Sequence, residues 1–240
     1  MKRIRLGVNI DHVATVRNAR GENYPSPLKA AQISERSGAN SITIHLREDR
    51  RHIHDKDLKL IISKLKIPLN LEIAATEEML KIALRNKPPF ICIVPEKRKE
   101  ITTEGGLNLN YKTVFLKRLI LKLKKKKIRV SLFIEPKKED IQKAKNLEVN
   151  CIEIHTGRFC NLVNKNKNFK KELNKIKKAV NYARGIGLEV HAGHGLTYKS
   201  AKILSKIKGI QEFNIGHFLI GESIFTGLSK TIKNFKKIIK

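Results

Sequence analysis

The sequence predicts an α/β protein, a (β/α)8 barrel of the triosephosphate isomerase (TIM) type with extra helices. Short apolar runs recur eight times along the 240 residues, and stretches with apolar residues every three or four positions separate them. Polar residues inside the runs recur at two-residue spacing, so they share one face of each strand. Eight such units match the length of a closed barrel of about 250 residues, and an open doubly wound sheet is the alternative.

The apolar runs are rich in Ile, Val, Leu and Phe, which favours buried strands. They cover residues 4–11, 41–46, 69–74, 90–95, 129–134, 151–156, 188–193 and 212–217. A long loop with Arg17, Arg20, Gly21 and Tyr24 is expected to follow the first strand. Ser26 before Pro27 predicts the start of the first helix.

Later helix starts follow the same rules. Asp55 and Asp57 suit the first turn of a helix between the second and third strands, and Thr76 suits an N-cap before the next helix. The predicted helix after Asp57 carries its apolar residues at helical spacing: Leu58, Ile61, Ile62 and Leu65.

Composition predicts one folded domain, residues 1–240. The chain is 40% hydrophobic, which is enough to bury a substantial core, and 51 Lys and Arg against 22 Asp and Glu leave a net charge of +29. This charge suggests a basic nucleic-acid-binding protein as an alternative. However, the lysines are spread over most predicted helices, aromatic residues make up 5% and Trp is absent. We therefore expect no specific nucleic-acid partner.

The cysteine count and the apolar runs predict a cytoplasmic location. Three cysteines argue against a disulfide framework and for a reducing compartment. Asn9, Asp11 and His12 interrupt the first apolar run before it reaches the length of an export signal. No apolar stretch approaches the roughly 20 residues that cross a bilayer, so no membrane partner is expected.

Polar residues gather at the predicted carboxyl ends of the strands, the edge where barrel enzymes build their sites. The pairs at two-residue spacing are Asn9 and Asp11, Thr43 and His45, Asn70 and Glu72, Glu153 and His155, and Asn214 and Gly216. Asn9 and Asp11 could alternatively only cap the loop that follows them.

The second and third strand ends predict proton transfer and anion binding. His45 lies where an apolar residue would stabilise the strand better, and an imidazole suits proton transfer near neutral pH. Arg47 offers a forked donor for a phosphate group. Glu72 needs a reason for its burial, either a structural ion pair or a raised pKa that makes it a base.

The sixth strand repeats this pattern with Glu153, and the last two strands end in glycines. Gly195 and Gly216 let backbone N–H groups approach an anion, and the loops after strands seven and eight are the usual phosphate site of this barrel. A phosphorylated substrate is therefore expected. No HExxH or CxxC spacing accompanies these residues, so no metal site is predicted.

The rim segments closely resemble the pyridoxine 5'-phosphate synthase family. The stretches that carry the resemblance are 7–15, 17–21, 45–52, 94–98, 102–106, 153–157, 192–197 and 214–217. The chain departs from the family only in its lysine-rich helices and its basic tail, residues 230–240.

The resemblance implies a cofactor-free transferase of vitamin B6 biosynthesis that works as a homo-octamer on two small phosphorylated substrates. It would condense 3-amino-2-oxopropyl phosphate with 1-deoxy-D-xylulose 5-phosphate to pyridoxine 5'-phosphate, phosphate and water. A barrel enzyme for another phosphosugar is the remaining alternative.

The resemblance also implies residue roles. The acid–base groups would be His45, Glu72 and His194, with Glu153 as a transition-state stabiliser. The aminoketone phosphate would be held by Asn9, Arg20, Gly195, Gly216 and His217. The deoxyxylulose phosphate would be held by Asp11, His12, Arg47, His52 and Thr102.

Overall fold

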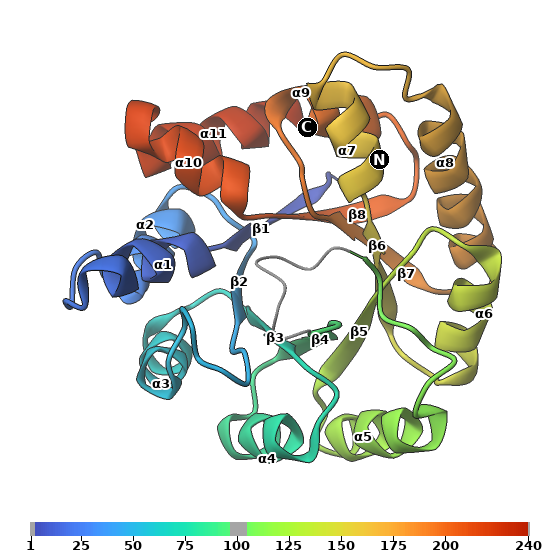
Figure 1. The fold of residues 1–240 in the computed structure, drawn as a ribbon, viewed down its shortest axis with the longest axis horizontal. Coiled ribbons are helices and arrows are strands. Elements are labelled where there is room, and N and C mark those ends of the chain that lie inside the picture. The colour runs from blue at the N-terminus through green and yellow to red at the C-terminus, as the bar shows by residue number, and fades with distance from the viewer. Residues whose placement is uncertain (1–2, 97–104, 240) are drawn as a thin grey trace.

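The eight predicted strands form one closed parallel barrel, described for residues 3–96 and 105–239 of a computed structural model (Figure 1). The strands are β1 (Arg5–Asn9), β2 (Ser41–His45), β3 (Leu69–Ile73), β4 (Phe90–Ile93), β5 (Arg129–Ile134), β6 (Cys151–His155), β7 (Glu189–Gly193) and β8 (Ile210–Ile215). Each strand pairs with the next in chain order, and β8 closes the ring against β1. This single-domain (β/α)8 barrel confirms the predicted fold class and excludes the open sheet.

Helices surround the barrel, and some connections contain more than one (Figure 1). Two helices, α1 (Asp11–Arg20) and α2 (Pro27–Arg36), lie between β1 and β2, and α7 (Gly157–Asn164) and α8 (Lys170–Gly185) lie between β6 and β7. The others are α3 (Asp55–Lys64), α4 (Glu77–Asn86), α5 (Thr113–Lys125), α6 (Lys138–Asn146), α9 (Tyr198–Leu204), α10 (His217–Thr226) and α11 (Leu228–Ile238). None of the helices described here is long and apolar enough to cross a membrane.

The predicted helix starts are confirmed. The Ser26 side chain accepts a hydrogen bond from the backbone N–H of Lys29, and Pro27 occupies the first turn of α2. The Thr76 side chain caps α4 in the same way through the N–H of Met79. Asp55 opens α3, as its sequence position suggested.

The expected long loop after β1 is wrong, because most of it is helix α1. Val13, Ala14 and Arg17 are buried, so this segment has its own inward face. Gly21 ends the helix in a left-handed conformation with φ 68°, and its N–H donates to the carbonyl of Asn18. The loop is therefore confined to the residues between Gly21 and α2.

The first and last predicted strands need corrected ends. β1 stops at Asn9, because Asp11 is already the first residue of α1. β8 covers Ile210–Ile215 instead of residues 212–217, because Gly216 and His217 begin α10. The residues at both ends remain at the same edge of the barrel.

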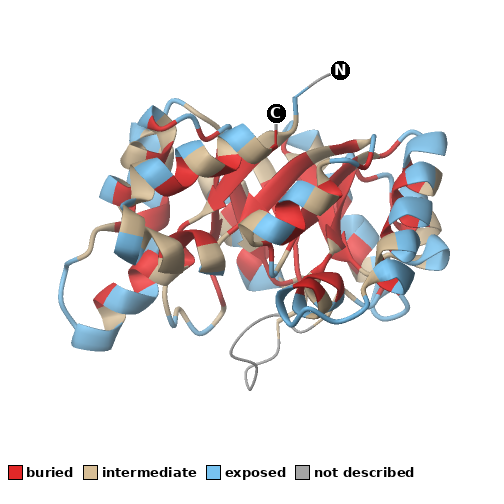
Figure 2. Cartoon of the chain, turned by 90° about the horizontal axis from the view of Figure 1, so that it is seen from above, coloured by how far each residue is buried: buried red, intermediate tan, exposed pale blue. Residues whose placement is uncertain are grey.

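Alternation along the strands separates the apolar core from the barrel interior. Val8, Ile44 and Leu71 belong to one connected core between the strands and the helices. Figure 2 shows this buried layer, with the exposed faces of the helices turned outward. The intervening polar positions face the interior of the barrel, as the two-residue spacing predicted.

The amino-terminal end of the barrel is filled by an ion-pair network. Glu189 pairs with Arg5 and with Arg129, and its carboxylate also contacts the imidazole of His191. Arg5 Nε donates to buried Glu212 at 2.7 Å. These groups pair with one another, so the chemistry expected at the mouth, the carboxyl ends of the strands, is confined to the opposite end.

Candidate active site

A chain of buried hydrogen bonds fixes Glu153 inside the barrel. Asn214 Nδ2 donates to Glu153 Oε2 at 2.6 Å. Thr43 Oγ1 donates to Asn214 Oδ1 at 3.3 Å. The same hydroxyl oxygen of Thr43 accepts a hydrogen bond from Asn70 Nδ2 at 3.4 Å. Each amide therefore has a defined orientation, and the chain links Glu153 of β6 to residues of three other strands, β8, β2 and β3.

Two carboxyl groups at the mouth have raised pKa values. Burial raises the pKa of Glu72 well above its ordinary value, and the charges of Glu153 and Asp11 add to this effect. Burial also raises the pKa of Glu153 to about 8, against the opposing hydrogen bond from Asn214. The charge of Glu212 further disfavours ionisation of Glu153, so at neutral pH the pair of Glu72 and Glu153 holds fewer than two negative charges.

Glu72 lies opposite His45 in the register of β3 and β2. Among the residues described here, no salt bridge to Glu72 is found, so the structural ion-pair interpretation has no partner to support it. A carboxyl with a raised pKa beside an imidazole can exchange protons near neutral pH.

A buried carboxylate that the sequence analysis did not assign, Glu96, orients His45. The two side chains meet at 3.3 Å between Nε2 and Oε2, and the Glu96 side chain is only 2% exposed. Burial raises the pKa of Glu96, but the hydrogen bond and charge of His45, the N–H of Glu48 and the charge of Arg47 together lower it further, so the net shift is downward. The available signal was its position, directly after Pro95 at the end of the fourth apolar run.

The predicted anion-binding residues Arg47 and His52 lie beside this pair. Arg47 is buried, with its Nε at 3.4 Å from Asp49 and 3.8 Å from Glu96. The half-buried His52 ring lies 6.0 Å from the ring of His45. The structure thus brings Arg47, His52 and His45 together, as predicted.

Asn9 and Asp11 bind each other and the neighbouring strand. Asn9 Nδ2 donates to Asp11 Oδ2 at 2.9 Å, and the backbone N–H of Asp11 donates to Asn9 Oδ1. Asp11 Oδ1 also accepts from the N–H of His45 at 2.9 Å. These contacts support the capping alternative, and they position both residues at the mouth.

His12 and His217 bring the first and last strand ends together. Their rings lie 4.9 Å apart, and His12 Nδ1 is buried without a hydrogen-bond partner among the described residues. Burial and the neighbouring His217 lower the pKa of His12, and Asp11 opposes them. A neutral imidazole nitrogen is therefore left for a ligand at this point.

The loop after β7 has a left-handed backbone at two successive residues. His194 has φ 77° and Gly195 has φ 76°. The His194 ring packs against the ring of His155, whose Nδ1 contacts Glu135 at 2.8 Å. The sequence analysis placed His155 at this edge without giving it a role, and it did not name Glu135.

One predicted site residue, Arg20, is not in this cluster. Arg20 is exposed at the end of α1, nine residues after Asp11, which is about 14 Å along a helix at 1.5 Å per residue. Thr102 lies outside the described residues. The correction of the loop to a helix explains the position of Arg20, because a loop could fold back over the mouth and α1 does not.

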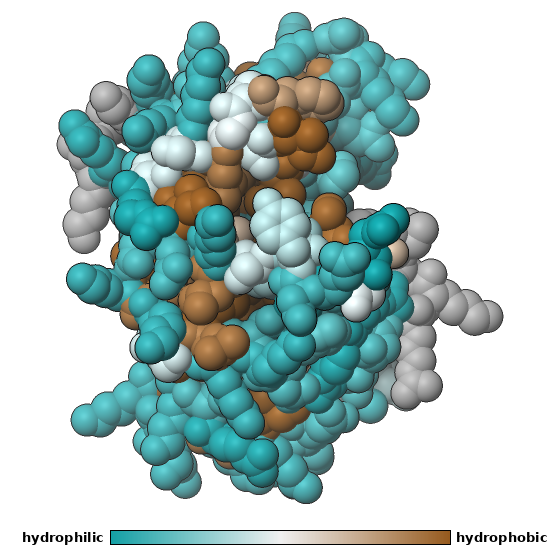
Figure 3. Space-filling model, turned by 90° about the vertical axis from the view of Figure 1, so that its left-hand side faces the viewer, coloured by the Kyte–Doolittle hydropathy of each residue, from teal (hydrophilic) through white to brown (hydrophobic). Residues whose placement is uncertain are grey.

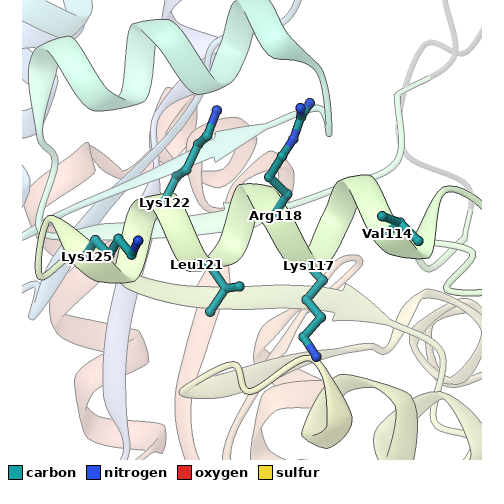
Figure 4. Close-up of a pocket in the computed structure, with 6 residues that line it drawn as sticks. All are labelled: Val114, Lys117, Arg118, Leu121, Lys122 and Lys125. Atoms are coloured by element: carbon teal, nitrogen blue, oxygen red, sulfur yellow. The ribbon is translucent and has the colours of Figure 1, made fainter.

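A surface groove on α5 is separate from the mouth (Figure 4). It is lined by Val114, Lys117, Arg118, Leu121, Lys122 and Lys125. These side chains offer positive charge and apolar surface but no carboxylate or imidazole, so the acid–base groups remain those of the mouth.

The fold and the mouth together define a (β/α)8-barrel enzyme equipped for acid–base chemistry. The family model described as pyridoxal phosphate biosynthesis protein PdxJ matches residues 6–240. The chain belongs to this family.

Curated relatives match this chain over most of their length. A protein of Pelagibacter ubique (strain HTCC1062) named pyridoxine 5'-phosphate synthase is 58% identical over 98% of both chains. A protein of the same name from Zymomonas mobilis is 53% identical, over 99% of this chain and 92% of its own.

Solved structures with low identity support the barrel fold. A structure named KGPDC from Streptococcus mutans has a TM-score of 0.69 and 13% identity, and the match covers 99% of this chain and 98% of its own. A phosphoribosylanthranilate isomerase from Thermotoga maritima has a TM-score of 0.62 at 15% identity, over 98% of both chains.

Proposed function

We propose that the mouth of the barrel condenses 3-amino-2-oxopropyl phosphate with 1-deoxy-D-xylulose 5-phosphate, giving pyridoxine 5'-phosphate, phosphate and water. Pyridoxine 5'-phosphate synthase activity is that of the family to which the chain belongs. The observation that carries the assignment of the site is Glu72, a carboxyl with a raised pKa that lies opposite His45 in the strand register and has no salt bridge among the described residues. We propose no cofactor for this reaction and a cytoplasmic location.

The roles of the acid–base groups follow from the chemistry of the condensation. Joining an amine to a ketone requires proton removal from nitrogen and proton delivery to a departing hydroxyl. Glu72 is the main base, because its raised pKa brings proton uptake closer to neutral pH. His45, which Glu96 holds in place, exchanges protons at the condensing carbon. Glu153 stabilises the transition state.

His194 protonates a leaving group or carbonyl. Burial and the neighbouring His155 and His217 lower its pKa to about 4, so the imidazole is neutral at pH 7. A neutral His194 must accept a proton from a reacting group before it delivers one. This favours a cycle in which the proton removed in an early step returns in a later elimination.

The two substrates occupy adjoining parts of the mouth. The deoxyxylulose phosphate is held by Asp11, His12, Arg47, His52 and Thr102, and the aminoketone phosphate is held by Asn9, Arg20, Gly195, Gly216 and His217. The contact between the rings of His12 and His217 supports this arrangement, because it joins one residue of each set at 4.9 Å. The carbons to be joined would meet near this boundary.

We propose that copies of this chain assemble, as a homo-octamer, through the side of the barrel around α1 and α10. Val16 and Tyr24 are exposed near α1, and Ile224 and Phe225 are exposed on α10. Figure 3 shows apolar surface interrupting the hydrophilic surface on this side. Arg20 is exposed near the same side, so a neighbouring copy could receive it. No specific nucleic acid and no membrane is proposed as a partner.

The test is incubation of the purified protein with both phosphorylated substrates, with detection of the pyridine product. Glu72→Gln should lower kcat by about 10²- to 10⁴-fold, because it removes the general base. In the unmodified enzyme kcat should rise with pH as Glu72 loses its proton, and this dependence should disappear from the variant. Normal turnover in a folded variant would contradict the assignment, and a loss of melting temperature alone would indicate a structural role.

A further inference from the structure

Two strand ends without an assigned function, those of β4 and β5, each supply a carboxylate to an imidazole on another strand. Glu96 follows β4 and contacts His45. Glu135 follows β5 and contacts His155, the last residue of β6. Neither Glu135 nor His155 has a proposed role in the reaction. However, the His155 ring contacts His194, which does have one.

The Glu135 contact fixes the orientation of the His155 ring. The distance from Nδ1 to Oε1 is 2.8 Å, and the same oxygen accepts the N–H of Gly106 at 2.9 Å. The hydrogen bond from His155 lowers the pKa of Glu135 more than burial raises it, so the carboxyl is ionised and can only accept. His155 Nδ1 therefore carries the hydrogen of this bond.

The opposite side of the His155 ring lies against His194. Their centroids are 4.9 Å apart at an interplanar angle of 63°. His155 Nε2 is buried and has no hydrogen-bond partner among the described residues. A Cβ at Gly157 would come within 2.6 Å of both His155 Nε2 and His194 Cδ2, so the two rings meet where only glycine leaves room.

We infer that Glu135 and His155 are a positioning pair for His194. The carboxylate orients the His155 ring, and that ring holds the His194 imidazole at its place in the mouth and disfavours its protonation. The inference rests on the proposed role of His194 in the reaction. It deepens that role by naming the residues that act through it.

The charged surroundings of His194 agree with this role. After burial, the largest cause of its lowered pKa is His155, followed by His217 of α10. Glu135 lies behind His155, and Lys137 acts on that carboxylate in turn. Cys160 of α7, close to Gly195, has a thiol whose pKa burial raises to about 11, so it adds no charge at neutral pH.

His155→Phe and Glu135→Gln test the inference. Phenylalanine keeps a ring between Phe133 and His194 and removes both nitrogens, and glutamine keeps the shape of Glu135 and removes its charge. Glu139→Gln, an exposed residue on α6, is the matched control for charge loss. Each test variant should lower kcat by about 10-fold or more, less than removal of His194 itself, while KM for either substrate changes little.

The second readout is the titration of His194, followed by NMR of its ring protons. His155→Phe should move the His194 pKa upward, because a neighbouring imidazole that disfavours its charge is gone. The same shift should appear in the pH profile of kcat. Glu139→Gln should change neither quantity.

Several results would overturn the inference. These are an unchanged kcat in a folded Glu135→Gln variant, an unchanged His194 titration in His155→Phe, or a loss of melting temperature with full kcat. If His155→Phe fails to fold, Glu135→Gln still decides through its kcat. An unmodified enzyme that makes no pyridine product would instead refute the proposed function, and the His194 titration would still test the contact between the rings.

Discussion

Replacement of Arg17 should both destabilise the barrel and weaken substrate binding. Arg17 is 4% exposed and donates two hydrogen bonds to the Asp57 carboxylate, of 2.7 and 2.9 Å. Arg17 Nη2 also donates to the carbonyl of His52 at 3.0 Å. The ion pair thus ties α1 and α3 to the loop between β2 and α3, which carries Arg47 and His52.

The magnitude follows from the burial of both partners. Breaking one side of a buried ion pair costs about 3–5 kcal/mol, because the remaining charge has no partner. Asp57 keeps the N–H of His54 at 2.9 Å and its place in the first turn of α3, which favours the lower end of this range. At about 2–4 °C per kcal/mol for a chain of this size, Arg17→Met should lower the melting temperature by about 6–12 °C.

The assay is a double-mutant cycle with Asp57→Asn, in which melting temperature and KM for each substrate are measured. The double variant should lose less stability than the sum of the single variants, because both charges leave together. KM for the deoxyxylulose phosphate should rise more than KM for the aminoketone phosphate. Arg36→Met, at the exposed end of α2, is the control. The reasoning is refuted if Arg17→Met melts like this control with both KM values unchanged.

Three further predictions concern the interior, the anion site and the outer ring. Gly7→Ala should lower the free energy of unfolding by about 1–3 kcal/mol and lower kcat, because its Cβ would lie 2.0 Å from Asn214 Oδ1 and displace the amide that holds Glu153. Denaturant unfolding measures the first quantity and a turnover assay the second. Wild-type values of both would be inconsistent with the hydrogen-bond network around Glu153. Arg47→Ala should weaken the deoxyxylulose phosphate more than the aminoketone phosphate in separate binding titrations, and equal losses would mean that the two sites are assigned wrongly. Replacing residues 124–127 by glutamine should leave turnover within a few-fold of the unmodified enzyme, since these lysines lie at the end of α5 and just after it, in the outer ring (Figure 1). A large loss of turnover in a folded, assembled variant would count against the placement of the active site at the mouth. Sequence-specific nucleic-acid binding would instead favour the alternative of a nucleic-acid-binding protein.

The fold and the inward face were readable from the sequence because both depend on local periodicity. Alternation at two residues decides which side chains of a strand share a face, and spacing of three to four residues marks the helices. Glu72 and Glu153 were recognisable on this basis, since a carboxylate inside an apolar strand stands out against its neighbours. Ser26 and Thr76 were recognisable as caps because capping involves residues only three positions apart.

The residues that the sequence analysis missed depend on contacts that only closure of the barrel creates. Glu96 meets His45 across 51 positions, and Glu135 meets His155 across 20, with no local pattern that links either pair. The sequence analysis assigned Arg17 to a loop because its segment is hydrophilic. The buried side of this segment exists only because the fold brings Asp57, 40 positions further along the chain, next to Arg17.

What the sequence by itself determined is therefore the barrel, the inward parity of its polar residues and the edge where they gather. The tertiary structure decided which carboxylate holds which imidazole, that Asp11 opens a helix, and that Arg20 is exposed at the end of that helix. The physical reason is that periodicity acts between neighbours in the chain, whereas hydrogen bonds and desolvation act between neighbours in space.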